Sequence, residues 1–411
     1  LFGTAHSYYS TEGSSQCIRA MLFLALQGAP QSGKRPVLLA ARNAHKALLY
    51  AAALLDFDIR WLWPSVQAEG ALCSCPVTAE ALTGVLHAMA QQGNTPFGVY
   101  VTSPDYLGGV QDIPALAAVC RAQGVPLLVD NAHGAYLRFL PQNCHPIAQG
   151  AAMCCDSAHK TLPVVTGGAY LHLAHDAPVQ DEAAVRGALA LFGSTSPSYL
   201  ILQSLDACNA VLAGDYPRRL EQCCAALGGL RRSLNENAAA RQCPVPLAVA
   251  GAQQEPMKLT LDAAALGCTG TALAEALRCA QMECEYADPR YVVLMFTPEN
   301  PSQDYTRLQT ALEQLLAAVP AGLSRPENRA GEFAALQQQA VQRCTIRQAV
   351  LGAQVRVPVH KALGRVCAMP TVSCPPAIPI VVSGEVIGPA ALELFAAYGV
   401  ETVSVVKPEK F

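Results

Sequence analysis

The sequence has few charged residues for its length. Its 411 residues include 28 basic and 31 acidic side chains, or 14% charged, whereas soluble proteins average about 25%. Aromatic residues are also scarce, at 6%. A net charge of −3 without a basic cluster argues against nucleic acid or an anionic membrane surface as the main partner. With 52% hydrophobic residues, the chain has enough apolar surface to fold, which excludes intrinsic disorder.

Long apolar runs and a paired-cysteine pattern are missing as well. The longest uninterrupted apolar run, residues 47–55, is far shorter than the roughly 20 residues that a membrane-spanning helix needs, so no such helix is predicted. The 17 cysteines are odd in number, and many lie inside apolar segments, such as Cys154 and Cys155. We therefore expect reduced, buried thiols in a cytoplasmic protein. Because the chain lacks an initiating methionine and opens directly in Leu-Phe-Gly-Thr-Ala-His, we also expect that an N-terminal segment is missing from it.

Between residues 14 and 175, apolar strands alternate with amphipathic helices. Strand-like runs occupy residues 37–40, 58–62, 98–102, 125–129, 151–155 and 168–173, and helical spacing occurs at 18–26, 44–55, 78–89 and 112–123. This alternation predicts an α/β fold with a mostly parallel sheet covered on both faces, and ligands then bind beyond the carboxyl ends of the strands. Later segments mix strands and helices, which predicts smaller α+β units. We expect three units, at 1–215, 216–332 and 333–411.

Four features that could bind a ligand or take part in catalysis lie at predicted strand ends or helix starts. Gly13 is followed by two serines, Ser14 and Ser15, at the start of a helix, where free N–H groups and the helix dipole attract phosphate. Asp130 closes the strand 125–129, and Lys160 follows Ser157 and His159 in the loop after the strand 151–155. His45 stands at a strand-to-helix junction. Taken singly, each has an ordinary alternative: a capped helix, a turn aspartate, a solvated lysine and a helix-start histidine.

Together these features match the requirements of pyridoxal phosphate. A lysine in so apolar a setting favours its neutral amine, which can attach the cofactor as a Schiff base. An aspartate thirty residues earlier can keep the pyridine nitrogen protonated, a helix N-terminus can hold the phosphate, and a flat side chain can cover the ring. The combination predicts a pyridoxal phosphate site at the carboxyl edge of the sheet.

Five segments in this region resemble the major domain of the bacterial Orn/Lys/Arg decarboxylase family, at residues 11–15, 42–46, 103–109, 130–134 and 157–163. The Pro-Pro-Ala-Ile-Pro segment at 375–379 and Gly384-Glu385 are similar to the family's C-terminal domain. The resemblance implies a fold-type-I major domain with a mixed, mostly parallel seven-stranded sheet. It also implies decarboxylation of arginine, lysine or ornithine for polyamine metabolism, in a homodimer or larger homo-oligomer.

The resemblance also implies individual roles. Lys160 would bind the cofactor covalently, Asp130 would pair with the pyridine nitrogen, and His45 would stack on the ring. His133 would lie close to the ring. The phosphate would be surrounded by residues of two segments: Gly13, Ser14, Ser15, Ser157 and His159. Thr195 belongs to a segment in which a hydroxyl reaches the partner subunit's cofactor phosphate.

Departures from the family pattern leave the substrate open. Tyr136 replaces a histidine near the active site, and Thr166-Gly167-Gly168, Ala377 and Ser383 also differ from the usual residues. The same cofactor chemistry would support an aminotransferase or lyase on another amino acid, and a pyridoxal-phosphate-binding protein without turnover is a further alternative. No metal site is predicted, because Cys73 and Cys75 have no second cysteine or histidine pair at a suitable distance.

Overall fold

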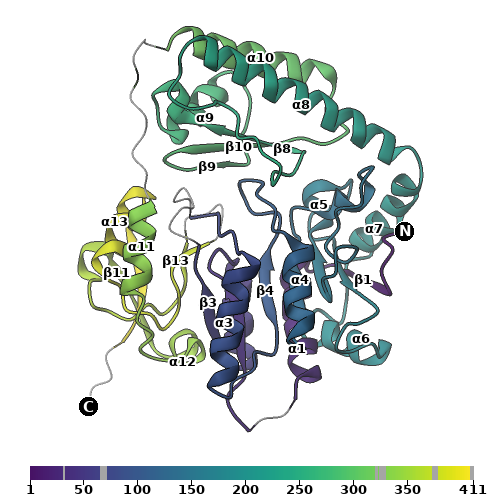
Figure 1. Ribbon diagram of the computed structural model, residues 1–411, viewed down its shortest axis with the longest axis vertical. Helices are drawn as coiled ribbons and strands as arrows, with labels where there is room; N and C mark the ends of the chain where they lie inside the picture. Colours follow the sequence, from purple (N-terminus) through teal and green to yellow (C-terminus); the bar gives the residue numbers. More distant parts are fainter. Residues whose placement is uncertain (31–32, 65–71, 320–322, 324–329, 373–377, 408–411) are drawn as a thin grey trace.

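The computed structural model describes residues 1–30, 33–64, 72–319, 323, 330–372 and 378–407. Figure 1 shows a sheet-containing unit in the lower centre, a unit with two long helices above it, and a C-terminal unit beside the sheet. Residues 375–377 of the C-terminal motif and most of residues 320–332, which precede the predicted third unit, lie outside the described residues. The three-unit division therefore stays a prediction.

The first unit is built on one mixed sheet of seven strands. These strands are β1 (His6–Ser10), β2 (Val37–Ala41), β3 (Asp58–Leu62), β4 (Val99–Thr102), β5 (Leu127–Asp130), β6 (Met153–Asp156) and β7 (Ala169–Leu173). Their order is β1-β7-β6-β5-β4-β2-β3. The five strands β3, β2, β4, β5 and β6 are parallel to one another, whereas β7 is antiparallel to both β6 and β1. The expected mixed, mostly parallel seven-stranded sheet is confirmed.

Helices cover both faces of this sheet because its strands are apolar on both sides. Buried residues of α1 (Gly13–Gly28), α2 (Lys46–Leu55) and α6 (Glu182–Leu191) form one core with the sheet. Those of α3 (Ala79–Gln91) and α4 (Ile113–Ala122) form another on the opposite face. Short helices follow two strands, η1 (Ala135–Phe139) after β5 and α5 (Ala158–Thr161) after β6, and α7 (Tyr199–Ala213) leads to the next unit. Thr78 and Asp112 cap α3 and α4 through their side-chain oxygens.

The second unit packs helices on a small antiparallel sheet of order β8-β10-β9. It contains α8 (Tyr216–Ala240), β8 (Lys258–Asp262), η2 (Ala263–Leu266), α9 (Gly270–Cys279), β9 (Tyr286–Ala287), β10 (Tyr291–Met295) and α10 (Ser302–Ala317). Residues 247–250, which are strand-like in sequence, form only an isolated bridge between Ala248 and Leu261. Figure 1 places β8 and β10 above the carboxyl end of the large sheet.

The C-terminal unit contains α11 (Ala330–Gln339), α12 (Ile346–Leu351), β11 (Gln354–Pro358), η3 (Val359–Lys361), β12 (Thr371–Val372), β13 (Pro379–Val381), α13 (Pro389–Ala397) and β14 (Thr402–Val406). In the described part of the chain, every cysteine is a free thiol, as expected. Among these residues, no helix is both long and apolar enough to cross a membrane.

A buried ion pair joins the C-terminal unit to the sheet. Arg42, which follows β2, has its guanidinium 3.2 Å from the Glu385 carboxylate, and the two side chains are 7% and 5% exposed. Arg42 also donates to the carbonyl of Ile380 at 3.0 Å. Its guanidinium carbon lies 5.0 Å from the ring centres of Trp61 and Trp63. The Glu385 of the Gly-Glu motif therefore contributes to docking of this unit.

Replacing Arg42 with methionine should destabilise the folded protein by about 3–5 kcal/mol, because Glu385 would remain buried without its cation. Arg186→Met is the matched control. Its ion pair with Glu182 is 68% and 62% exposed, and such pairs contribute at most about 1 kcal/mol. Urea unfolding of both variants measures the difference. Equal losses in the two variants would contradict a stabilising role for the buried pair.

Candidate active site

The site is assembled where parallel strands of the large sheet end. Asp130 is the last residue of β5, and Lys160 lies in α5, four residues beyond the end of β6. His45 joins β2 to α2, and Ser14 lies in the first turn of α1. Gly13 turns the chain into α1 with a φ of +71°, a conformation that glycine adopts without strain. Four segments distant in sequence thereby contribute to one pocket.

The pocket is lined by Ser14, Asn43, His45, Cys73, Thr102, Tyr106, Asp130, Ala132, His133, Lys160 and Ile378. Five of the residues predicted from the sequence are therefore brought together. Ile378 comes from the C-terminal unit, so residues of both the first and the C-terminal unit line the pocket.

Lys160 and His133 meet inside this pocket, with 3.1 Å between Nζ and the imidazole Nε2. Burial lowers the pKa of Lys160, partly offset by the charge of Asp130. Burial also holds the pKa of His133 well below its usual value, and the nearby cations of Lys258 and Lys160 act in the same direction. His133 is therefore neutral near pH 7, and its Nε2 can accept a hydrogen bond from the amine.

Hydrogen bonds from two neighbouring residues fix the orientation of the Asp130 carboxylate. Its Oδ2 accepts a hydrogen bond from the Tyr100 hydroxyl at 3.0 Å, and its Oδ1 accepts from the Ala132 amide at 3.2 Å. Burial, and then the charge of Asp130, raise the pKa of Tyr100 well above its usual value, so the hydroxyl remains a donor. The carboxylate is 2% exposed and lines the pocket.

His45 has a double role in the local structure. Its Nδ1 accepts a hydrogen bond from the Ala47 amide at 3.2 Å, so its side chain caps α2. Burial lowers the pKa of His45 to about 4, which keeps the imidazole neutral at pH 7. The cap fixes a flat, uncharged ring in the pocket wall. The ordinary helix-start function and the predicted position beside the ring of the cofactor are therefore compatible.

Tyr106 and Tyr100 were not identified as site residues from the sequence. The Tyr106 ring lies edge-on to His133, with centroids 4.7 Å apart, and 6.0 Å from Lys160 Nζ. Tyr106 belongs to the segment 103–109, whose resemblance to the family was a signal for it. Tyr100 lies inside the strand β4 and carried no motif.

The pocket contains buried polar atoms that fit a polar ligand. Asn43 Oδ1, Thr102 Oγ1 and His133 Nδ1 have no hydrogen-bond partner, and all three residues line the pocket. Unpaired buried polar atoms are costly, so several in one cavity indicate that a ligand or water satisfies them. An amine, a carboxylate and neutral imidazoles are also the side-chain groups that a pyridoxal phosphate site requires. The residues present therefore fit this cofactor.

Other predicted cofactor residues lie outside the pocket lining. Ser157 donates its hydroxyl hydrogen to Ser14 Oγ at 2.7 Å, and so acts on the pocket through Ser14. His159 Nδ1 lies 2.9 Å from the carbonyl oxygen of Gly168. Ser15 is half-buried beside Ser14, and Thr195 is exposed in the segment before α7. The chain by itself does not bring Thr195 to its own pocket.

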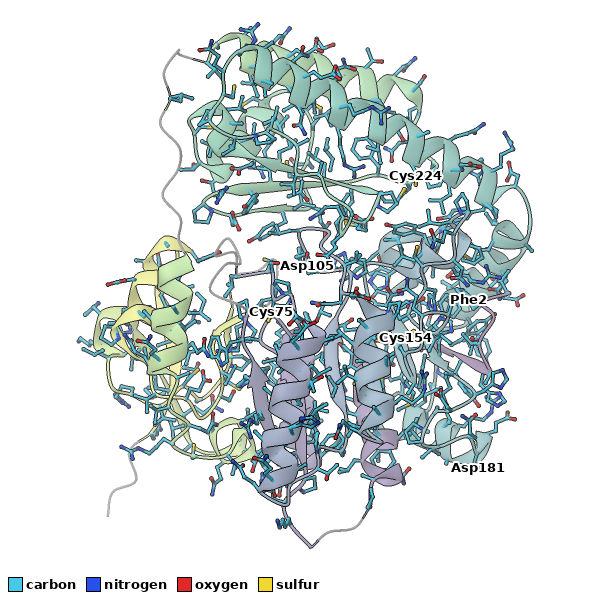
Figure 2. The ribbon with its side chains drawn as sticks, in the orientation of Figure 1. Phe2, Cys75, Asp105, Cys154, Asp181 and Cys224 are labelled. Carbon is cyan, nitrogen blue, oxygen red and sulfur yellow. The ribbon has the colours of Figure 1, made fainter. Side chains whose placement is uncertain are left out.

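Tyr136, the departure that weakened a substrate assignment, lies away from the pocket wall. It is fully buried, and its hydroxyl donates a hydrogen bond to Glu255. Burial raises the pKa of Glu255 to about 7, although the charge of Lys258 opposes the rise. The tyrosine therefore connects the first unit to the loop before β8. Asp105, labelled in Figure 2, lies in the same region between the sheet and the β8–β10 unit, where its carbonyl accepts from Lys258 Nζ at 2.6 Å.

The sheet, its helices and this pocket define an α/β protein of the fold-type-I pyridoxal phosphate class. Solved structures share the fold. The constitutive lysine decarboxylase of Escherichia coli matches 99% of this chain and 71% of its own, with a TM-score of 0.72 and 19% identity. The lysine decarboxylase of Francisella novicida matches 99% and 70%, with a TM-score of 0.76 and 17% identity.

The chain belongs to the Orn/Lys/Arg decarboxylase family. The model of the family's major domain matches residues 1–254, and that of its C-terminal domain matches residues 328–399. The arginine decarboxylase of Bacillus subtilis is 26% identical over 394 residues, which cover 94% of this chain and 76% of the relative. The constitutive lysine decarboxylase of E. coli is 26% identical over 234 residues, covering 53% of this chain and 30% of the relative. The expected family and the expected amino-acid decarboxylase class are confirmed.

Proposed function

We propose that the protein catalyses pyridoxal-phosphate-dependent decarboxylation of a basic amino acid, namely arginine, lysine or ornithine, and supplies the amine product to polyamine metabolism. One observation carries the proposal. The buried amine of Lys160 lies 3.1 Å from neutral His133, in a pocket that also contains the carboxylate of Asp130. This is a lysine prepared for covalent chemistry beside an anion that can stabilise a protonated ring nitrogen.

The residues of the pocket divide the work of catalysis. Bound pyridoxal phosphate would supply an electron sink for the pair of electrons left when the bond to the α-carboxylate breaks. Lys160 Nζ is held ready as a nucleophile, because burial lowers its pKa. His133 Nε2 accepts a hydrogen bond from Lys160 Nζ and so orients the amine. Asp130 would stabilise positive charge at the ring nitrogen, and the hydrogen bond from Tyr100 holds the carboxylate in place.

The remaining predicted residues would orient the cofactor. The neutral His45 ring would cover the pyridine ring without placing a positive charge against it. Ser14, with Ser157 hydrogen-bonded to it, and the first amides of α1 would bind the phosphate. Ser15 and His159 flank this group in sequence and are assigned to the phosphate as well.

An acidic group beside the pocket supports a basic substrate. Glu285 Oε1 lies 3.5 Å from the hydroxyl of Tyr106, and its charge acts on Lys160. Glu285 is exposed, so it can meet a side chain that extends from the pocket toward solvent. A cationic substrate side chain would be attracted there and an acidic one repelled. The arginine decarboxylase of B. subtilis, which is 26% identical over 394 residues, makes arginine the first candidate.

A panel of amino acids tests the proposal. We expect purified protein with added pyridoxal phosphate to release CO2 from at least one of arginine, lysine and ornithine, without forming a keto acid. Glutamate is the control of opposite charge, and Glu285→Gln should raise KM for the preferred substrate about 3- to 10-fold by removing the attraction. Keto-acid formation would indicate an aminotransferase. Cofactor binding without turnover of any amino acid would indicate a non-catalytic protein.

We further infer a cytoplasmic homodimer or larger homo-oligomer with shared active sites. The exposed position of Thr195, outside its own pocket, supports its assignment to the partner subunit's phosphate. The large side chains of Leu191, Tyr199 and Leu200 around this segment are 61%, 83% and 74% exposed. Apolar side chains concentrated in one exposed segment are typical of an interaction surface.

A further inference from the structure

A second cluster of ligating side chains lies on the large sheet, outside the lining of the Lys160 pocket. His145, Asp156 and His172 contribute it, and their side chains are completely buried. The Nε2 atoms of the two histidines are 3.1 Å and 3.2 Å from the same carboxylate oxygen, Asp156 Oδ2. The decarboxylation proposed above uses none of these three residues.

The register of the sheet builds this cluster. His172 on β7 is the direct cross-strand neighbour of Cys154 on β6 and of Ser7 on β1. Asp156 follows Cys154 by two residues, so both side chains lie on the face that carries His172. His145 approaches from the loop before β6. The antiparallel placement of β7 therefore brings two histidines to one carboxylate.

Hydrogen bonds alone leave the cluster incomplete. Asn131 Nδ2 donates to Asp156 Oδ1 at 2.7 Å, and His145 Nε2 shares a hydrogen bond with Oδ2. His172 Nε2 is buried near that oxygen and has no hydrogen-bond partner. Among the described residues, no lysine or arginine forms an ion pair with Asp156. A buried carboxylate is costly unless a cation lies beside it, and a metal ion held between Asp156 and the two histidines would supply that charge.

We propose that His145, Asp156 and His172 bind a structural zinc ion, with Cys154 as the fourth ligand. Zinc–nitrogen and zinc–oxygen bonds of about 2.0–2.2 Å in a tetrahedron place ligand atoms about 3.3 Å apart, close to the separations observed here. Cys154 Sγ lies 3.8 Å from His145 Nε2 and 3.9 Å from Asp156 Oδ1. The thiol loses its proton to solvent when it coordinates the metal. A set of two imidazoles, a carboxylate and a thiolate suits zinc among the common divalent ions.

The surroundings of the cluster fit a closed metal site. The Ser7 hydroxyl lies 2.7 Å from His172 Nδ1 and can accept its hydrogen, which leaves Nε2 free to bind metal. The Phe2 ring covers both histidines, with its centroid 4.6 Å from that of His172 and 6.3 Å from that of His145. Figure 2 labels Phe2 and Cys154 on the β1 side of the sheet unit. Because this burial leaves no open position for substrate, the site is structural.

Bound zinc would brace the part of the sheet that carries the proposed active site. Asp156 ends β6 just before the segment with Lys160, and its partner Asn131 directly follows Asp130. The metal would therefore join β6 to β7, and the hydrogen bond from Asn131 to Asp156 would connect it to the end of β5. This consequence rests on the proposed function, but zinc binding itself does not.

Metal analysis of the tag-free holoenzyme tests the proposal. After equilibration with zinc chloride and removal of free metal, we expect about one zinc ion per chain, as for a single closed site. His87→Gln, which changes an exposed histidine on α3, should retain it. His172→Gln and Asp156→Asn should lose most of the metal, and Cys154→Ser should bind it more weakly. Cobalt in place of zinc should give tetrahedral absorption bands in the visible range, at wavelengths beyond the band of the cofactor.

The wild-type protein decides the test even where a variant folds poorly. Less than about one zinc ion per ten chains in the wild type would overturn the proposal, as would purely octahedral cobalt bands. Equal zinc affinity in the wild type, His172→Gln and Asp156→Asn would also overturn it. The thermal unfolding midpoint of the wild type should rise with zinc and fall after chelation, and amino-acid turnover is not needed for any of these measurements.

Discussion

Lys160→Ala is expected to lose the absorption band of covalently bound pyridoxal phosphate and at least about 10³-fold in decarboxylation rate, because no other group would replace its nucleophilic amine. The Lys160 amine is buried beside His133, and burial lowers its pKa. We therefore expect its loss to reduce activity more than any other substitution considered. Absorbance titration with the cofactor and CO2 release measure the two losses. Lys361→Ala, at an exposed lysine of η3, should leave both unchanged.

A labelling experiment would distinguish Lys160 from a second buried lysine, Lys258. Lys258 Nζ lies 5.7 Å from the ring centre of Tyr106, and burial lowers the pKa of Lys258 to about 8. Its Nζ, however, donates to the carbonyl of Asp105 at 2.6 Å and is outside the pocket lining. Borohydride reduction followed by peptide mapping should find the cofactor on Lys160. A band that persists in Lys160→Ala, with the label on Lys258, would refute the assignment.

Asp130→Asn should lower kcat by about 10²- to 10³-fold while the protein still folds and binds the cofactor. The amide oxygen can keep one of the two hydrogen bonds that Tyr100 and Ala132 donate to separate carboxylate oxygens. The substitution therefore preserves the size of the side chain and removes its negative charge together with one accepted hydrogen bond. Without that charge, protonation of the ring nitrogen is no longer favoured and the electron sink weakens. Steady-state kinetics and cofactor titration separate the two effects.

Asp112→Asn is the matched control for this loss of charge. Asp112 caps α4 through a hydrogen bond from the Ala115 amide, and it lies outside the pocket. Its replacement should change kcat by less than about 2-fold, because a surface cap affects stability by roughly 1 kcal/mol and leaves the reacting groups in place. A similar kcat in Asp130→Asn and Asp112→Asn would show that Asp130 has no role at the ring.

Much of the fold could be predicted because local patterns and tertiary structure agree. The strand 125–129 and the helix 112–123 carry continuous apolar or periodic residues, and β5 and α4 lie within one or two residues of them. The strand β1 was not predicted, because its sequence His-Ser-Tyr-Tyr-Ser contains no apolar run and pairs only with β7. Residues 247–250 also have a strand-like composition. In the described structure they form a single bridge to Leu261 and no continuous strand.

The sequence by itself determined the family, the fold class and the identity of the residues at the ends of strands and at helix starts. Lys160, Asp130, His45 and Ser14 could be named because each follows a local pattern that has a chemical meaning. Tertiary structure alone decided that Tyr100 fixes Asp130 and that Tyr106 packs on His133. It also decided that two histidines meet Asp156. These contacts depend on strand order and register, which a chain with few charges and many apolar segments does not specify locally.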